Sequence, residues 1–300
     1  MELGYQKPLY ILAFDHRGSF QKKFFGVAGT PTAEDTARIS DAKTVIFEGL
    51  LRALDDVGLE AAGALVDEQF GADIARKAKA EGLTLAMPVE KSGQEEFDFE
   101  YGDEFGSHVE EFDPTFTKVL VRYNPEGDAE MNARQAARLE RLSDWLHQRN
   151  RRFLFELLVP AEQHQLDAVG GDAKAYDRDV RPGLMRGAIA QLQDAGVEPD
   201  IWKIEGIDKR EDCEAISAQC RSGSGREDVA CVVLGRGADD SAVDHWLRMG
   251  SGVPGYIGFA IGRTIWWDPL KSYVDGSSGR GDAAGAIGAN YRRFVEVYQG

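Results

Sequence analysis

Residues 117–159 read TKVLVRYNPEGDAEMNARQAARLERLSDWLHQRNRRFLFELLV and contain the pattern that decides the fold. An apolar run at 117–123 is followed by a turn with Pro and Gly, an amphipathic stretch at 129–148 and a second apolar run at 152–159. Short apolar runs bounded by turn residues are typical of buried strands, and the longer amphipathic stretch has the length of a helix. The segment therefore predicts two parallel strands joined by a helix.

The same alternation runs through the whole chain. Apolar runs that predict strands lie at 9–15, 63–67, 83–88, 117–123, 152–159, 200–205, 230–235 and 255–260. Stretches that predict helices lie at 34–56, 129–148, 184–195, 210–221, 241–249 and 283–298. Eight such units in 300 residues predict an α/β fold of the (β/α)8 TIM-barrel type. No linker divides the sequence, so we expect one domain over residues 1–300. Residues 161–180 are expected to form a long loop, either a lid or a solvated surface loop.

Composition limits the classes of partner. A net charge of −16 disfavours nucleic acid as a partner, because phosphate backbones favour basic surfaces. No stretch approaches the apolar length of a membrane span, which predicts a protein without a membrane partner. Three cysteines without metal-ligand spacing favour a reducing cytoplasm. Barrels of this kind often associate, so a homo-oligomer is possible.

Lys203 is the most informative residue of the predicted strands. In DIWKIEG, period-two alternation places Ile201, Lys203 and Glu205 on one face of the strand, opposite two apolar side chains. If the apolar face packs under helices, Lys203 points into the barrel. A poorly solvated ammonium there makes neutral amine available, and the amine can attack a ketone to form an iminium. A purely structural lysine paired with a barrel carboxylate is the alternative.

Further charged residues stand in or just after the other strands. Glu156 interrupts the apolar FLFELLVP, where it would either transfer protons or neutralise Lys118 or Lys203. Lys118 shares a strand face with Arg122, which would hold a substrate carboxylate or form a salt bridge at the rim. Candidate site residues after the first and third strands are Asp15, His16, Arg17 and Glu90.

Two Gly-Arg sequences suggest a phosphate site. LGRG contains Gly235, Arg236 and Gly237, and AIGRT contains Gly262 and Arg263; they follow the last two predicted strands. Many barrels bind phosphate in the loops after strands seven and eight, where glycines allow close approach of backbone N–H groups. The arginines would add charge-assisted hydrogen bonds.

These motifs together resemble those of a known family. The sequence is similar to the class I aldolase group that includes tagatose-1,6-bisphosphate aldolase, and in particular to the domain fused C-terminally to 5-dehydro-2-deoxygluconokinase in bacterial inositol catabolism. The motifs that carry the resemblance are LAFDHRGSF (12–20), LVDEQFG (65–71), AMPVEKSG (86–93), KVLVRYNPEGD (118–128), FLFELLVP (153–160), WKIEG (202–206) and GFAIGRTIWWDP (258–269). The tagatose-type enzymes usually carry Gln where this chain has His16.

The resemblance implies a Schiff base at Lys203 with Glu156 as its proton-transfer partner. It implies that Lys118 and Asp15 line the same site and that Arg263, with the glycine before it, holds the phosphate. The implied substrate is 2-deoxy-5-keto-D-gluconate 6-phosphate, cleaved to dihydroxyacetone phosphate and malonate semialdehyde without a metal or organic cofactor. Another ketose phosphate, such as tagatose bisphosphate or sulfofructose phosphate, remains open. A sugar-phosphate isomerase or epimerase and a non-catalytic binding barrel are the competing interpretations. We expect a separate kinase to supply the phosphorylated substrate.

Overall fold

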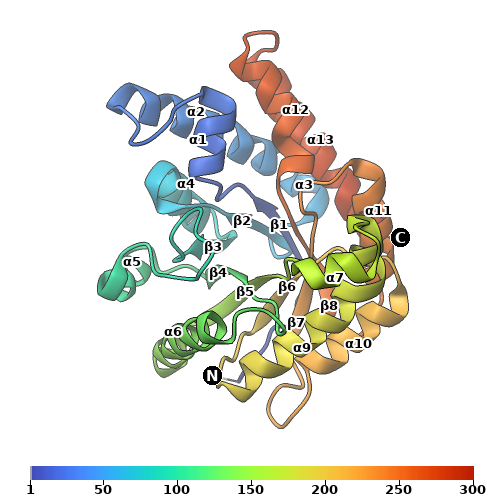
Figure 1. Ribbon diagram of the computed structural model, residues 1–300. Coiled ribbons are helices and arrows are strands. Elements are labelled where there is room, and N and C mark those ends of the chain that lie inside the picture. Colours follow the sequence, from blue (N-terminus) through green and yellow to red (C-terminus); the bar gives the residue numbers. More distant parts are fainter. Residues whose placement is uncertain (1) are drawn as a thin grey trace.

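A computed structural model describes residues 2–300 and shows a closed barrel of eight parallel strands in chain order (Figure 1). The strands are β1 Leu9–Ala13, β2 Ala62–Leu65, β3 Thr84–Pro88, β4 Phe116–Arg122, β5 Arg152–Leu158, β6 Ile201–Glu205, β7 Ala230–Leu234 and β8 Tyr256–Ile261. Each pairs in parallel with its neighbours, and β8 closes the barrel against β1. The predicted TIM barrel is confirmed, with strand ends that differ by one or two residues.

Helices surround the barrel (Figure 1). They are α1 Gly18–Phe25, α2 Ala33–Arg52, α3 Leu54–Val57, α4 Glu68–Ala80, η1 Gly102–Glu104, α5 Phe105–Phe112, α6 Ala129–Gln148, α7 Gln163–Ala168, α8 Ala173–Ala175, η2 Tyr176–Val180, α9 Arg181–Asp194, α10 Arg210–Cys220, α11 Asp240–Gly250, α12 Arg263–Val274 and α13 Arg280–Gln299. No helix among residues 2–300 has both the length and the hydropathy needed to cross a membrane.

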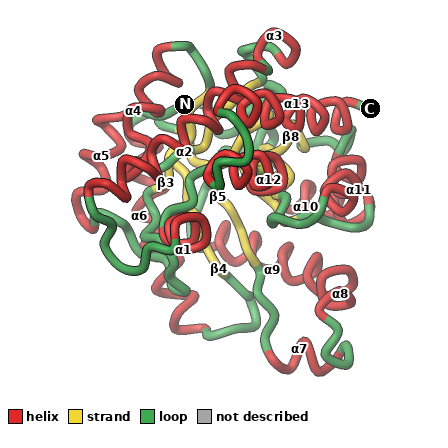
Figure 2. The backbone as a smooth tube through the Cα atoms, turned by 90° about the horizontal axis from the view of Figure 1, so that it is seen from above, coloured by secondary structure: helices red, strands yellow, loops and turns green. Residues whose placement is uncertain are grey.

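Two expectations about local structure were wrong. The stretch 34–56 is not one helix, because α2 ends at Arg52 and α3 begins at Leu54. Residues 161–180 are not a loop: they contain α7, α8 and the π-helix η2. Asp172 accepts hydrogen bonds from the backbone N–H groups of Lys174 and Ala175, and such capping stabilises a short helix that carries little apolar periodicity. Figure 2 shows α7 and α8 at one end of the molecule.

Capping residues define where several longer helices begin. Thr32 and Asp35 form a capping box at α2, and Asp67 accepts a hydrogen bond from Phe70 N at the start of α4. Asp128 accepts from the N–H groups of the first turn of α6. These side chains satisfy backbone donors that have no partner within the helix. The long amphipathic helices therefore start at the positions that the local sequence specifies.

Side chains alternate between two layers along each strand. On β6, Ile201 belongs to the core inside the barrel, whereas Trp202 and Ile204 belong to the core between strands and helices. The inner core also contains Leu9, Phe116 and Leu154. On β4, β5 and β6, the next inward-facing positions toward the carboxyl ends are Lys118, Glu156 and Lys203. The apolar layer thus forms a floor beneath the charged groups described next.

Candidate active site

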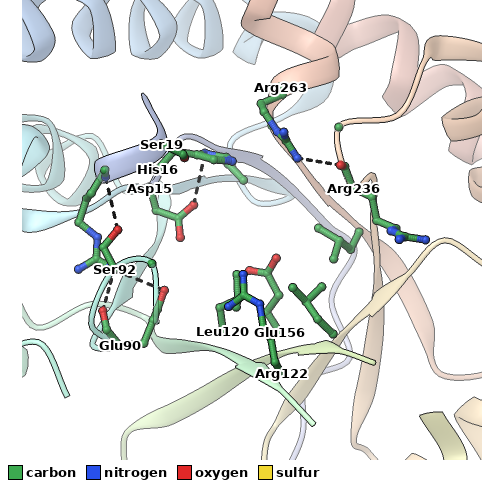
Figure 3. Close-up of a pocket in the computed structure, with 18 of the residues that line it drawn as sticks. Asp15, His16, Ser19, Glu90, Ser92, Leu120, Arg122, Glu156, Arg236 and Arg263 are labelled. Carbon is green, nitrogen blue, oxygen red and sulfur yellow. Dashed lines mark hydrogen bonds and ion pairs between the residues drawn. The ribbon is translucent and has the colours of Figure 1, made fainter. Parts of the chain in front are cut away.

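A cavity of about 1140 Å³ opens at the carboxyl ends of the strands (Figure 3). The apolar core fills the barrel beneath it and closes the floor of the cavity. The structure brings every predicted site residue to this cavity. These residues are Asp15, His16, Arg17, Glu90, Lys118, Arg122, Glu156, Lys203, Gly235, Arg236, Gly237, Gly262 and Arg263. Their clustering follows from the parallel strands, whose carboxyl ends meet at one rim.

Lys118 lies inside the barrel and is surrounded by acids. Its side chain is 1 % exposed, and its Nζ lies 2.8 Å from Asp15 Oδ2, 2.9 Å from Glu90 Oε1 and 3.0 Å from Glu156 Oε2. Burial disfavours the ammonium, but the three carboxylates together raise the pKa of Lys118 well above its ordinary value. Lys118 is therefore a fixed cation inside the barrel.

Lys203 shares one of these acids. Its side chain is 3 % exposed, and its Nζ lies 2.9 Å from Glu156 Oε2, the oxygen that also contacts Lys118. It forms no ion pair with a second carboxylate among residues 2–300. Burial alone would raise the pKa of Glu156, yet the charges of Lys118 and Lys203 lower it. Lys203 is thus the less constrained of the two buried amines.

Asp15 and His16 follow β1. Burial opposes ionisation of Asp15, but Lys118, His16 and Lys203 hold its pKa below the usual value. Burial lowers the pKa of His16 to about 4, so the imidazole is neutral at pH 7. His16 Nδ1 is buried without a hydrogen-bond partner among the described residues and faces the carboxylate of Asp15 at 4.0 Å. A neutral ring of this kind can bind a hydroxyl group.

Arg17 and Glu90 form a second buried pair. Arg17 donates to the backbone oxygen of Glu90 at 2.6 Å and to Glu100 Oε2 at 2.9 Å, so its guanidinium is engaged by the protein. Burial raises the pKa of Glu90 against the opposing charges of Lys118 and Arg17. Glu90 Oε2 has no hydrogen-bond partner in the described part of the chain. Glu90 therefore brings to the cavity wall a buried acceptor that is unpaired within residues 2–300.

The two Gly-Arg sequences lie side by side. Arg236 and Gly237 both adopt positive φ angles, 53° and 70°, which turn the backbone sharply after β7. The Arg263 side chain donates to the backbone oxygen of Arg236 at 2.7 Å (Figure 3). The φ of 70° at Gly237 is one that other residues rarely adopt, and a Cβ there would lie 2.5 Å from Arg263 Cζ, so a larger residue would be strained and would displace the Arg263 side chain. Arg263 is the first residue of α12, and Gly262 precedes it.

The two arginines of this cluster differ in their partners. Arg236 forms ion pairs with Glu205 at 3.0 Å and with Asp177 at 2.8 Å, so its guanidinium is compensated by the protein. Arg263 forms no ion pair with any carboxylate of residues 2–300. Its charge, together with the glycine-rich backbone and the start of α12, provides a place for an anion.

Arg122 ends β4 and lines the cavity with Leu120. Its Nη1 donates to the backbone oxygen of Gln94 at 2.8 Å. The alternative of a salt bridge at the rim was wrong, because no carboxylate in the described chain pairs with Arg122. A half-buried guanidinium with only a carbonyl partner is an unusual feature of an acidic protein.

Sequence reasoning missed two groups that support the site. Lys43 of α2 is fully buried and donates to Phe14 O and to Asp67, which fixes the end of β1. A lysine on the apolar face of an amphipathic helix was the available signal. Tyr176 and Asp177 of η2 line the cavity, and Tyr176 donates to Val159 O at 3.0 Å. They lie in the segment that was expected to be a loop.

The fold is shared with solved structures of low sequence identity. One is Cgl0159 from Corynebacterium glutamicum, with a TM-score of 0.61 and 15% identity over 99% of this chain and 88% of that one. Another is a Schiff-base-forming fructose-1,6-bisphosphate aldolase, with a TM-score of 0.54 and 13% identity over 96% of this chain and 94% of that one. Identities this low show a common barrel fold and no more.

The sequence of this chain matches the model of one protein family. No curated protein sequence matches the chain. A family model described as "Uncharacterized protein conserved in bacteria" matches residues 4–300. The chain therefore belongs to this family, DUF2090.

Proposed function

We propose that the protein is a class I aldolase that forms a Schiff base through Lys203 and cleaves a phosphorylated ketose-type substrate. The observation that carries the proposal is the pair of amines inside the barrel. Lys118 pairs with three carboxylates, whereas Lys203 pairs with one among residues 2–300, that of Glu156, whose oxygen it shares with Lys118. Lys203 is therefore the buried amine with fewer ionic partners, and an amine of this kind is the nucleophile that attacks a carbonyl carbon to form a Schiff base.

Glu156 is placed to move the protons of Schiff-base formation. The carboxylate accepts a proton from the Lys203 ammonium at 2.9 Å, and the amine then adds to the ketone. Glu156 returns that proton to the hydroxyl of the carbinolamine, which leaves as water and gives the iminium. The fixed charge of Lys118, 3.0 Å from the same oxygen, keeps Glu156 ionised between these transfers.

Carbon–carbon cleavage then needs a base for a substrate hydroxyl. The hydroxyl proton is removed, the bond to the carbon next to the iminium breaks, and the electron pair moves into the iminium to form an enamine. Glu90 and Asp15 both face Lys118. Because burial raises the pKa of Glu90 and its Oε2 has no partner among residues 2–300, Glu90 is the stronger base of the two.

Arg263→Ala is expected to weaken the binding of phosphorylated ligands by roughly 10- to 100-fold, the effect of losing one charge-assisted hydrogen bond. Stability should change little, since Arg263 is half-buried and, in the described part of the chain, its side chain bonds to a backbone carbonyl and to no carboxylate. Calorimetric titration with dihydroxyacetone phosphate measures the effect. Lys22→Ala is the matched control, because it removes an exposed cation from the same cavity. Equal affinity of Arg263→Ala and the wild type would place the phosphate elsewhere.

The substrate follows from the family resemblance. We propose 2-deoxy-5-keto-D-gluconate 6-phosphate, whose ketone forms the iminium and whose products are dihydroxyacetone phosphate and malonate semialdehyde. Tagatose bisphosphate and sulfofructose phosphate are the other ketose phosphates to test. A cleavage assay that compares the three, together with fructose bisphosphate, ranks them by kcat/KM.

Reductive trapping tests the Schiff base directly. We expect borohydride with dihydroxyacetone phosphate to give a stable adduct on Lys203, located by peptide mass spectrometry. An isomerase, an epimerase or a binding protein needs no covalent lysine and would leave Lys203 unmodified. Absence of the adduct in wild-type protein would overturn the aldolase proposal, and a turnover assay would then separate those alternatives.

A further inference from the structure

Two guanidinium groups in the cavity lack a carboxylate partner among residues 2–300, and they stand on opposite sides. Arg263 follows β8 and Arg122 ends β4, four strands away in a closed eight-stranded barrel. Figure 3 shows Arg263 at the upper side of the cavity and Arg122 at the lower side. Lys203 lies on β6, midway between β4 and β8 in strand order. A molecule that spans the cavity therefore meets one free cation at each end and the amine between them.

The other arginines of the cavity show how unusual this is. Arg17 contacts Glu100 at 2.9 Å, and Arg236 contacts Asp177 at 2.8 Å, so the protein itself compensates both. Arg122 is half-buried, and its hydrogen bond to Gln94 O holds the guanidinium in the cavity wall. A partly desolvated charge is costly without a counterion. The chain has a net charge of −16, so carboxylates are abundant, yet none pairs with Arg122 within residues 2–300. We infer that the counterion of Arg122 is an anionic group of a ligand.

The surroundings of Arg122 differ from those of Arg263. On the β7–β8 side, a glycine-rich turn and the start of α12 accompany the arginine. On the β4 side, Asp128 already accepts from Glu130 N and Met131 N in the first turn of α6. The start of α6 is thus already capped, whereas the start of α12 has no side-chain cap and leaves its backbone N–H groups to a phosphate. The planar guanidinium of Arg122 can bind a carboxylate through two parallel hydrogen bonds.

We propose that Arg122 binds a carboxylate at the end of the substrate that leaves as the aldehyde product. This inference rests on the proposed aldolase function and adds a specificity-determining residue to it. The phosphate-bearing half stays on Lys203 as the enamine, near Arg263. The other half departs with its carboxylate at Arg122, across the cavity. The substrate class is therefore a ketose with a phosphate at one end and a carboxylate at the other.

The aldol direction tests this with three acceptors. The assay compares three proteins: the wild type, Arg122→Gln and Lys91→Gln. Each receives dihydroxyacetone phosphate as the donor. The acceptor is malonate semialdehyde, glyceraldehyde 3-phosphate or uncharged glyceraldehyde. We expect Arg122→Gln to raise the KM for malonate semialdehyde by roughly 10- to 100-fold and to leave the KM for glyceraldehyde unchanged. Lys91→Gln removes an exposed cation from the loop that contains Gln94 and should behave as wild type. Thermal unfolding confirms that each variant is folded.

The outcomes separate this inference from the function on which it rests. If borohydride traps dihydroxyacetone phosphate on Lys203 but Arg122→Gln leaves the KM for malonate semialdehyde unchanged, the assignment of Arg122 is overturned. A wild-type preference for glyceraldehyde 3-phosphate that Arg122→Gln abolishes would overturn the choice of carboxylate. If wild-type protein gives no trapped adduct, the aldolase fails, and calorimetric binding of malonate semialdehyde to wild type and Arg122→Gln still decides the role of Arg122.

Discussion

Lys203→Met is expected to reduce cleavage by about 1000-fold or more, because removing a covalent nucleophile eliminates the reaction path itself. The same variant should give no adduct with borohydride and dihydroxyacetone phosphate. Phosphate binding at Arg263 should persist, since that site does not include Lys203. Single-turnover assays and calorimetry on the same sample separate the two effects. Substantial cleavage by Lys203→Met would show that the Schiff base forms elsewhere or not at all.

The fold of Lys203→Met should survive. Methionine fills a similar volume, and a volume-conserving change of this kind usually costs less than about 1.5 kcal/mol. Glu156 also keeps a cation after the substitution, because Lys118 still lies 3.0 Å from its Oε2. Urea unfolding checks this expectation. A large loss of stability would mean that the inactivity reports unfolding and not the loss of the amine.

Lys118→Met is expected to destabilise the protein by about 3–5 kcal/mol, the usual cost of removing one partner from a buried ion cluster. Lys118 contacts Asp15, Glu90 and Glu156, and its loss leaves three buried carboxylates close together. Within residues 2–300, Lys203 can compensate only Glu156 of these three. Urea unfolding at pH 7 measures the change, and Lys203→Met is the matched control, since it removes an amine from the same cluster but strands no carboxylate.

The pH dependence gives a second test of Lys118. In the wild type, Lys118 lowers the pKa of Asp15 and of Glu156, so their contribution to stability is present at neutral pH and is lost as pH falls. Without Lys118, burial dominates and raises the pKa of these acids, so the variant gains relative stability on acidification. The deficit should therefore be smaller at pH 5 than at pH 7. An equal deficit at both values would contradict the ion cluster as its cause.

Much of the barrel was predictable because its strands are encoded locally. The helix predicted at 129–148 coincides with α6, whose N-terminus is set by Asp128. The eight apolar runs became the eight strands. Strand alternation also predicted that Ile201 and Trp202 face different layers of the core, as they do. Residues 161–180 escaped prediction, because η2 is held by contacts such as that of Tyr176 with Val159, which a local pattern does not contain.

The sequence by itself determined that the charged residues of the strands reach the cavity. Period-two alternation directs Lys118, Glu156 and Lys203 inward, and parallel pairing brings their strand ends to one rim. Only the tertiary structure decided how the charges are shared: Lys118 has three carboxylates, Lys203 has one, and Arg122 has none within residues 2–300. The physical reason is the distance along the chain over which each property is set. Alternation is a property of consecutive residues, whereas a charge is set by neighbours within a few ångströms that come from distant parts of the chain.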